Sequence, residues 1–339
     1  MKTTSSAPGK IILSGEHAVV YGKPALITAV ASFVQCEVTP SLTGGLSFGS
    51  DSFATYTTTA EELRSRRIKV LEDWERFGAG QIAIIDVLSR NNELLSLCWA
   101  ELDADYPDRI SPMSAVNVSS ELPVGCGMGS SAAVCAAGLS ALAAASDVTL
   151  QKQELYQLCL RLERFQHGTP SGADPYIAVH GGSVLFERDG GATPVGLPAV
   201  PLHIVQTGQP AATTGEAVSE VRGTHGNSPI WDQFASITKR LSESIRAGDS
   251  AETIRSIREN HRLLVEIGVV PKRVQEFVDD VESTGGAAKI SGAGTIRGDA
   301  AGAVLVCTQH VPDELCDEYG YSMSRMKGEP DGVRVLDLG

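Results

Sequence analysis

The sequence predicts an α+β fold, because its strands and helices follow one another in a mixed order. A segment rich in Val, Ile and Thr at residues 25–38 is typical of a strand. Between residues 151 and 166, apolar residues recur at steps of three and four, which indicates a helix with one buried face. A chain of 339 residues can bury the core of one large or two modest domains.

The expected elements follow in chain order. In the first half we predict strands over 11–13, 25–38 and 113–120, and helices over 81–100, 132–145 and 151–166. In the second half we predict strands over 181–186, 202–206, 287–291, 302–307 and 333–337, and helices over 214–222, 230–247, 250–266 and 272–283. We place the domain junction near 180–190, with residues 1–185 as the N-terminal domain and 186–339 as the C-terminal domain.

The net charge and the cysteine content indicate which kinds of partner the protein can bind and in which cellular compartment we expect it. A net charge of −13 argues against a nucleic-acid partner, so an anionic ligand would need local positive groups such as Lys10, Arg297 and helix N-termini. Seven cysteines without CxxC spacing indicate reduced, mostly buried thiols in a cytoplasmic protein. No apolar run approaches the roughly 18 residues of a membrane span, so we expect no membrane partner. The oligomeric state stays open, with a homodimer as one alternative.

Residues 122–133, which read LPVGCGMGSSAA, form the most informative segment. Three glycines at alternate positions let the backbone approach a bulky group, and an alanine-rich helix follows. A strand, a glycine loop and a helix N-terminus in this order create an anion site suited to phosphates. The segment lacks the Gly-Lys-Ser/Thr ending of a Walker A loop. The alternative interpretation is a tight turn that lets the helix pack on the strand.

Three further segments accompany this loop. They are Ser6–Lys10 with Gly15–Gly22 (SAPGK and GEHAVVYG), Glu163–Pro175 (ERFQHGTPSGADP) and Lys289–Gly294 (KISGAG). With the loop they resemble the GHMP small-molecule kinases, and most closely the mevalonate kinases, from Ser6 to about residue 305. The resemblance implies an N-terminal α+β domain and a ferredoxin-like C-terminal domain, with the active site in the cleft between them.

The resemblance also implies a site for ATP and Mg²⁺. The phosphates would be held by Lys10, Ser120, Gly125, Cys126, Gly127, Met128, Gly129, Ser130 and Ser131. Ser131 and Glu163 would bind Mg²⁺, a cation that prefers a few hard oxygen ligands and keeps several waters. A helix N-cap is the alternative for Ser131, and a solvated helix carboxylate is the alternative for Glu163. Cys126 stands where a small residue is usual.

The implied catalytic residues are Asp174 and Lys10. Asp174 lies in a Gly- and Pro-rich stretch, 168–175, which we expect to be a loop. By resemblance it accepts the proton of the substrate hydroxyl, and Lys10 keeps it ionised and stabilises developing negative charge. A turn-forming aspartate and a surface lysine are the alternatives.

Substrate contacts are expected, on the same ground, from a set of cleft residues. They are Glu16, His17, Thr169, Ser171, Asp174, Gly294 and Arg297. For His17 the alternative is a buried histidine bonded to the backbone, whereas His167 is expected to be structural.

The C-terminal half departs from the family pattern in two places. A glycine run usually follows the Gly-Ala-Gly motif, but residues 292–299 read GAGTIRGD. An Arg-Ser-Thr segment is often found upstream, but residues 207–213 here contain no arginine. One interpretation is that Arg297 supplies the missing cation, pairing bidentately with a carboxylate or phosphate. The other is a surface pair between Arg297 and Asp299.

The resemblance therefore implies ATP-dependent phosphorylation of the primary hydroxyl of mevalonate to 5-phosphomevalonate, for isoprenoid precursor synthesis. The alternatives are another GHMP kinase, acting as a phosphomevalonate kinase, mevalonate 3-kinase or sugar kinase, and, less favoured, diphosphomevalonate decarboxylase or a GHMP-fold regulator without turnover. A regulator need not keep Lys10, Ser131, Glu163 and Asp174 together, as this chain does.

Overall fold

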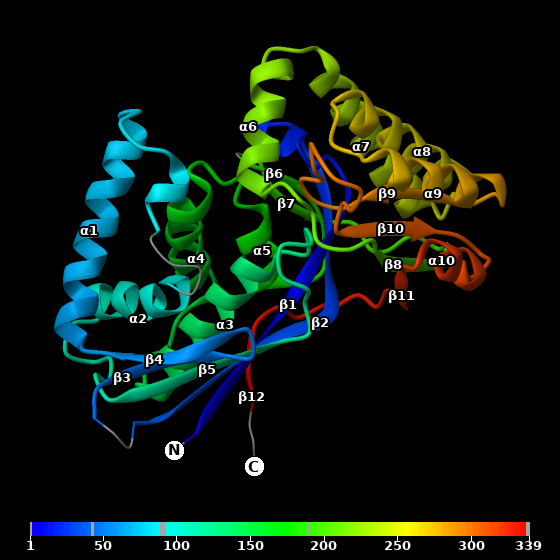
Figure 1. Ribbon diagram of the computed structural model, residues 1–339. Coiled ribbons are helices and arrows are strands. Elements are labelled where there is room, and N and C mark those ends of the chain that lie inside the picture. Colours follow the sequence, from blue (N-terminus) through cyan, green and yellow to red (C-terminus); the bar gives the residue numbers. More distant parts are fainter. Residues whose placement is uncertain (1, 42–43, 89–92, 189, 337–339) are drawn as a thin grey trace.

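Two β-sheets with their own helices make up the structure, a computed structural model that describes residues 2–41, 44–88, 93–188 and 190–336 (Figure 1). The larger sheet has eight strands in the order β12-β1-β2-β5-β3-β4, and β6 and β7 extend it from β2. Its strands are β1 (Thr3–Ser14), β2 (Ala25–Pro40), β3 (Leu46–Ser50), β4 (Phe53–Thr58), β5 (Ser114–Ser120), β6 (Ser183–Glu187), β7 (Gly191–Pro194) and β12 (Arg334–Leu336).

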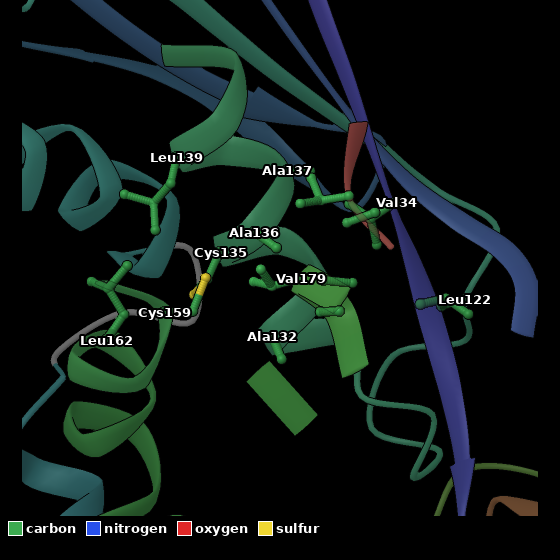
Figure 2. Close-up of a cluster of buried hydrophobic side chains, with 14 of the residues drawn as sticks. Val34, Leu122, Ala132, Cys135, Ala136, Ala137, Leu139, Cys159, Leu162 and Val179 are labelled. Atoms are coloured by element: carbon green, nitrogen blue, oxygen red, sulfur yellow. The ribbon is translucent and has the colours of Figure 1, made fainter. Parts of the chain in front are cut away.

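The helices of this part are α1 (Ala60–Gly78), α2 (Glu93–Asp105), α3 (Ser130–Ala145), α4 (Lys152–His167) and α5 (Ala173–His180), with short 3-10 turns η1 (Ala18–Tyr21) and η2 (Ile84–Asp86). Helix α3 is largely buried, because its alanines let it pack closely on β1 and β2. In Figure 2, Ala137 points toward Val34 of β2, while Cys135 faces Cys159 of α4. The close fit fixes the start of α3, which carries the glycine loop.

The smaller sheet contains β8 (Leu202–Gln206), β9 (Ala287–Ile290), β10 (Ala303–Cys307) and β11 (Ser322–Arg325). All its pairs are antiparallel and the strand order is β11-β8-β10-β9. Helices α6 (Thr214–His225), α7 (Ile230–Ala247), α8 (Ser250–Glu266) and α9 (Lys272–Ser283) lie between β8 and β9, and α10 (Asp313–Tyr319) lies between β10 and β11. This β-α-β-β-α-β succession with its strand order is the ferredoxin-like arrangement that the resemblance implied.

The sheets divide the chain later than residue 185. The predicted boundary falls inside β6, whose partners β2 and β7 both belong to the larger sheet. The smaller sheet begins only at β8, and β12 returns to pair with β1. The limits of the two domains stay a prediction, and the sheets favour a division between β7 and β8.

The prediction of one helix over 81–100 is wrong. The chain forms η2 at Ile84–Asp86 and α2 from Glu93, and residues 89–92 lie outside the described part. Helix α1 and the hairpin of β3 and β4 were not predicted. Apolar spacing is weak here because Arg64 and Arg67 of α1 pair with Asp103 and Glu101, which are buried on α2. Ion pairs thus form part of the contact between α1 and α2, where apolar side chains are more usual.

The predicted reduced and mostly buried thiols agree with the structure, in which all seven cysteines are free and buried. Among the described residues, each helix is too short or too polar to cross a lipid bilayer.

Candidate active site

The glycine loop has the backbone conformation that its sequence requires. Gly125, Gly127 and Gly129 have φ angles of 73°, 78° and 71°, in the left-handed region where side chains are disfavoured. A Cβ on Gly127 would stand 2.2 Å from the Ser291 carbonyl oxygen, and one on Gly129 would stand 2.8 Å from Lys10 Cγ. Close contact with other chain segments, as well as the turn itself, therefore demands glycine here.

Backbone hydrogen bonds fix this loop to both sheets. The Lys10 amide donates to the Met128 carbonyl at 2.9 Å, and the Ala303 amide of β10 donates to the Cys126 carbonyl at 2.9 Å. The loop leads directly into α3, whose N-cap is Gly129. Neither Ser130 nor Ser131 caps this helix through its side chain, so the N-cap interpretation of Ser131 is wrong. The first amides of an α-helix have no partners within the helix, so the first turn of α3 is able to accept an anion.

Lys10 and Asp174 approach each other at the centre of the candidate site. Lys10 Nζ lies 3.4 Å from Asp174 Oδ1, with side-chain exposures of 5% and 34%. Asp174 is the second residue of α5 and not part of a loop, because Gly172, with φ of 89°, ends the turn and caps the helix. The helix N-terminus and the lysine both place positive charge beside the carboxylate of Asp174. The surface-lysine alternative is wrong, since Lys10 is 4% exposed.

Glu163 is a buried carboxylate with an unused oxygen. It is 2% exposed, its Oε2 lies 3.5 Å from His167 Nε2, and its Oε1 is buried without a hydrogen-bond partner. Burial raises the pKa of Glu163 and the nearby Asp174 adds to this, whereas His167, Ser131 and Lys10 lower it. The solvated-carboxylate alternative is therefore wrong. A buried, unsatisfied carboxylate oxygen beside a serine hydroxyl fits a hard cation.

A cavity of about 260 Å³ connects these groups. Its walls come from both parts of the molecule: β1 and the chain after it, α4, the start of α5, helix α6, and the Gly292–Ala293 segment. Several predicted site residues line it, namely Lys10, Glu16, His17, Glu163, Thr169, Ser171 and Asp174. Residues from distant parts of the chain thus meet in one concave space, which is where small ligands bind.

Glu16 and His17 are both buried and both hydrogen-bonded to protein. Glu16 forms an ion pair with Lys289 and accepts a hydrogen bond from Asn260 Nδ2 at 3.1 Å, so both of its oxygens are engaged. His17 Nε2 lies 2.9 Å from the Ala293 carbonyl oxygen. Burial lowers the pKa of His17, so its ring is neutral near pH 7, with Nε2–H donating and Nδ1 left as an acceptor. The backbone-bonded interpretation of His17 thus holds for one nitrogen.

The predicted loop residues 125–131 do not line this cavity, and neither do three other predicted site residues, Ser120, Gly294 and Arg297. The Ser120 hydroxyl bonds within its own turn, donating to the Leu122 carbonyl at 3.1 Å. Gly294 packs against the Val269 carbonyl. Arg297 is 52% exposed and pairs with Glu216 on α6 at 2.7 Å, not with Asp299. Their binding roles stay predictions that the cavity does not support.

The sequence did not point to the cavity residues on α6 and near α1. Thr214, Ser219 and Arg222 come from α6, and Phe77 and Ile84 come from α1 and η2. The absence of arginine from 207–213 could have directed the search to the next arginine in the sequence, Arg222, because α6 follows that segment immediately.

The fold and the phosphate loop are those of the GHMP kinases, and the family model "GHMP kinases N terminal domain" matches residues 93–182. A curated mevalonate kinase from Thermococcus gammatolerans is 31% identical over 310 residues, 87% of each chain. This chain therefore belongs to the mevalonate kinase family.

Solved structures agree on the fold. The mevalonate kinase of Methanococcus jannaschii has a TM-score of 0.78 at 19% identity, over 96% of this chain and 98% of that one. The galactokinase of Lactococcus lactis, solved with galactose, has a TM-score of 0.77 at 15% identity, over 99% and 95%. Since two kinases with different names fit almost equally, the fold alone does not choose a substrate.

Proposed function

We propose that this protein transfers the γ-phosphoryl group of ATP to the primary hydroxyl of mevalonate, which gives 5-phosphomevalonate and ADP. Membership of the mevalonate kinase family supports this activity. The single structural observation that carries it is the Lys10–Asp174 pair at 3.4 Å, placed in a cavity beside a glycine-rich phosphate loop.

The phosphates of ATP are assigned to the loop at 125–131 and to the N-terminus of α3. The loop glycines expose backbone N–H groups, and the dipole of α3 adds positive potential at the same point. Hydrogen bonds from Lys10 and Ala303 hold the loop in place, so little reorganisation is needed when phosphate binds. Transfer of a phosphoryl group depends mainly on such positioning and charge stabilisation.

Asp174 is assigned the role of proton acceptor. As the hydroxyl oxygen attacks the γ-phosphorus, the bond from that phosphorus to the β,γ-bridging oxygen breaks, and the hydroxyl proton passes to a carboxylate oxygen of Asp174. The partial exposure of Asp174 lets it reach a bound alcohol, whereas buried Lys10 stays beside it. The lysine offsets negative charge on the carboxylate and on the migrating group.

Glu163 and Ser131 would hold Mg²⁺. Glu163 offers its unpartnered Oε1, and the Ser131 hydroxyl lies close enough to the same carboxylate to lower its pKa. Among the described residues there is no cluster of three or more His, Cys, Asp or Glu side chains for a metal. The proposal rests on Glu163 and Ser131 alone, because Mg²⁺ binds proteins through one or two side chains and takes its other ligands from phosphate and water. When bound, Mg²⁺ neutralises phosphate charge.

The remaining walls fit a small branched alcohol. Phe77, Ile84 and Val218 supply apolar surface, while Thr169 and Ser171 supply hydroxyls near Asp174. His17 presents Nδ1 as an acceptor for a substrate hydroxyl, because its other nitrogen is bonded to Ala293. Most ligand pockets have this combination of apolar walls and a few placed polar groups.

The experiment is an ADP-release assay on the purified full chain with mevalonate, phosphomevalonate, diphosphomevalonate and galactose, followed by phosphorus NMR of the product. We expect mevalonate to be the preferred substrate and the new phosphate to couple to a CH₂ group, as in a 5-phosphate. Phosphate on the tertiary oxygen, which lacks that coupling, would indicate a 3-kinase instead. Preference for another substrate, or release of CO₂, would overturn the proposal.

A further inference from the structure

The cavity contains a cation that the proposed phosphoryl transfer does not use. Arg222 lies in the last turn of α6 and lines the same cavity as Lys10, Asp174 and His17. Helix α6 comes from the ferredoxin-like part and lies beside the chain that follows β1 (Figure 1). It thus brings Arg222 to a cavity whose reacting residues belong to β1 and α5.

The other basic side chains of this cavity already have acidic partners or are neutral. Lys10 is paired with Asp174, and His167 lies beside Glu163. His17 is neutral near pH 7 because burial lowers its pKa. In the described part of the chain, Arg222 has no Asp or Glu within ion-pair distance, unlike Arg297. Arg222 is exposed, and no acid among the described residues offsets its charge, so its guanidinium can pair with an anionic ligand.

The neighbour of Arg222 is a fixed phenol and not an acid. The ring of Tyr21 stacks on Trp231 with centroids 4.1 Å apart, and its buried hydroxyl lies close to the Arg222 guanidinium. Burial raises the pKa of Tyr21, and the Arg222 guanidinium lies close enough to lower it. Tyr21 therefore bounds the guanidinium on one side without neutralising its charge.

The proposed substrate needs such a group. Mevalonate carries a carboxylate at the end of the molecule opposite its primary hydroxyl. With that hydroxyl at Asp174, the carboxylate must lie elsewhere in a cavity of a protein with net charge −13. A buried or half-buried carboxylate is costly unless it is paired, and a guanidinium can pair with it through two parallel hydrogen bonds.

We propose that Arg222 binds the carboxylate of the substrate and so selects acids over neutral alcohols of the same shape. This inference rests on the proposed function and names the residue that makes its site specific for an acid. It assigns binding and selectivity to Arg222, whereas Asp174 and Lys10 keep the chemistry.

The test compares mevalonate with its primary amide, which has nearly the same shape and no charge. For the wild-type protein we expect kcat/KM to favour the acid by about 10- to 100-fold, the size expected of a charge-assisted pair. In Arg222→Gln the preference should fall to a few-fold, chiefly through KM for mevalonate, with KM for ATP unchanged. Arg222→Lys keeps the charge but loses the bidentate geometry of the guanidinium, so it should retain part of the preference for the acid.

The matched control is Arg255→Gln, the same change of charge on α8, at an arginine that is 65% exposed and paired with Glu252. It should keep the wild-type preference. An unchanged preference in Arg222→Gln, or its loss in Arg297→Gln alone, would overturn the inference while the proposed function stands. A wild-type protein that phosphorylates neither compound would overturn both.

Discussion

Lys289 and Glu16 form an ion pair in which neither side chain has any solvent exposure. Lys289 Nζ also donates to the Ile12 carbonyl at 2.9 Å, and Asn260 Nδ2 donates to Glu16 Oε2. The pair therefore joins β9 of the ferredoxin-like part to the chain that leads from β1 to His17. It positions the floor of the cavity, because Glu16 is next to His17 in the sequence.

Replacing one partner of this pair should destabilise the protein strongly. Lys289→Met leaves the Glu16 carboxylate buried and unpaired, which costs about 3–5 kcal/mol in comparable cases. The measurement is the free energy of unfolding in urea. The double variant Lys289→Met with Glu16→Gln should lose less than Lys289→Met alone, since no buried charge remains.

Lys272→Met is the matched control, because Lys272 is 88% exposed and its effect should stay within about 1 kcal/mol. Equal losses for Lys289→Met and this control would show that the buried pair contributes nothing.

Gly127→Ala should impair the phosphate loop more than its backbone conformation alone explains. The new Cβ would meet the Ser291 carbonyl oxygen at 2.2 Å, so the loop and the Gly292 segment must separate. We expect weaker nucleotide binding and a lower melting temperature. Gly248→Ala is the control, because its φ of 69° is similar but open space surrounds it. If both variants lose the same stability and Gly127→Ala binds nucleotide normally, the close packing is unimportant.

Glu163→Gln should stabilise the nucleotide-free protein at neutral pH. The pKa of Glu163 is raised by burial in the folded state, so the fold favours its protonated form. Stability is therefore lost as the pH rises from the ordinary glutamic acid pKa of about 4.3 through the higher folded-state value. Glutamine has no proton to lose. The melting temperature of the variant should therefore exceed that of the wild-type protein as the pH rises through this range, and the difference should vanish at lower pH.

The same variant should bind Mg²⁺ poorly. With a non-hydrolysable ATP analogue, added Mg²⁺ should raise the melting temperature of the wild-type protein more than that of Glu163→Gln, because an amide is a weaker ligand for a hard cation. Identical Mg²⁺ shifts in the two proteins would remove Glu163 from the metal site.

Much of the second half was predictable because its elements have ordinary apolar periodicity. Helices α7, α8 and α9 and strand β8 begin and end where the sequence pattern placed them. Helix α1 was not predicted, although Leu63, Val70 and Phe77 pack on the core. Its ion pairs with α2 place charged residues between these apolar positions, which weakens the apolar pattern. The start of α5 was not predicted, because Gly and Pro at 168–175 are typical of loops, whereas Gly172 is in fact the N-cap of a helix.

Sequence motifs predicted most of the residues of the candidate site, and the remaining ones were identified only from the tertiary structure. Lys10 and Asp174 are 164 positions apart in numbering, yet their motifs were enough to pair them. Arg222 carries no motif, and only the position of α6 brings it to the cavity. Arg297 looked suitable by sequence because a cation was missing at 207–213, but its partner in the fold is Glu216.

The measurement that tests the central claim most directly is the turnover of Asp174→Asn with mevalonate and ATP. The variant keeps the size of the side chain and removes its charge and its ability to accept a proton. We predict a fall in kcat of at least about a hundredfold, with nucleotide affinity unchanged. Asp232→Asn, at an aspartate that is 75% exposed, should keep full activity. Near-normal turnover in Asp174→Asn would contradict the account.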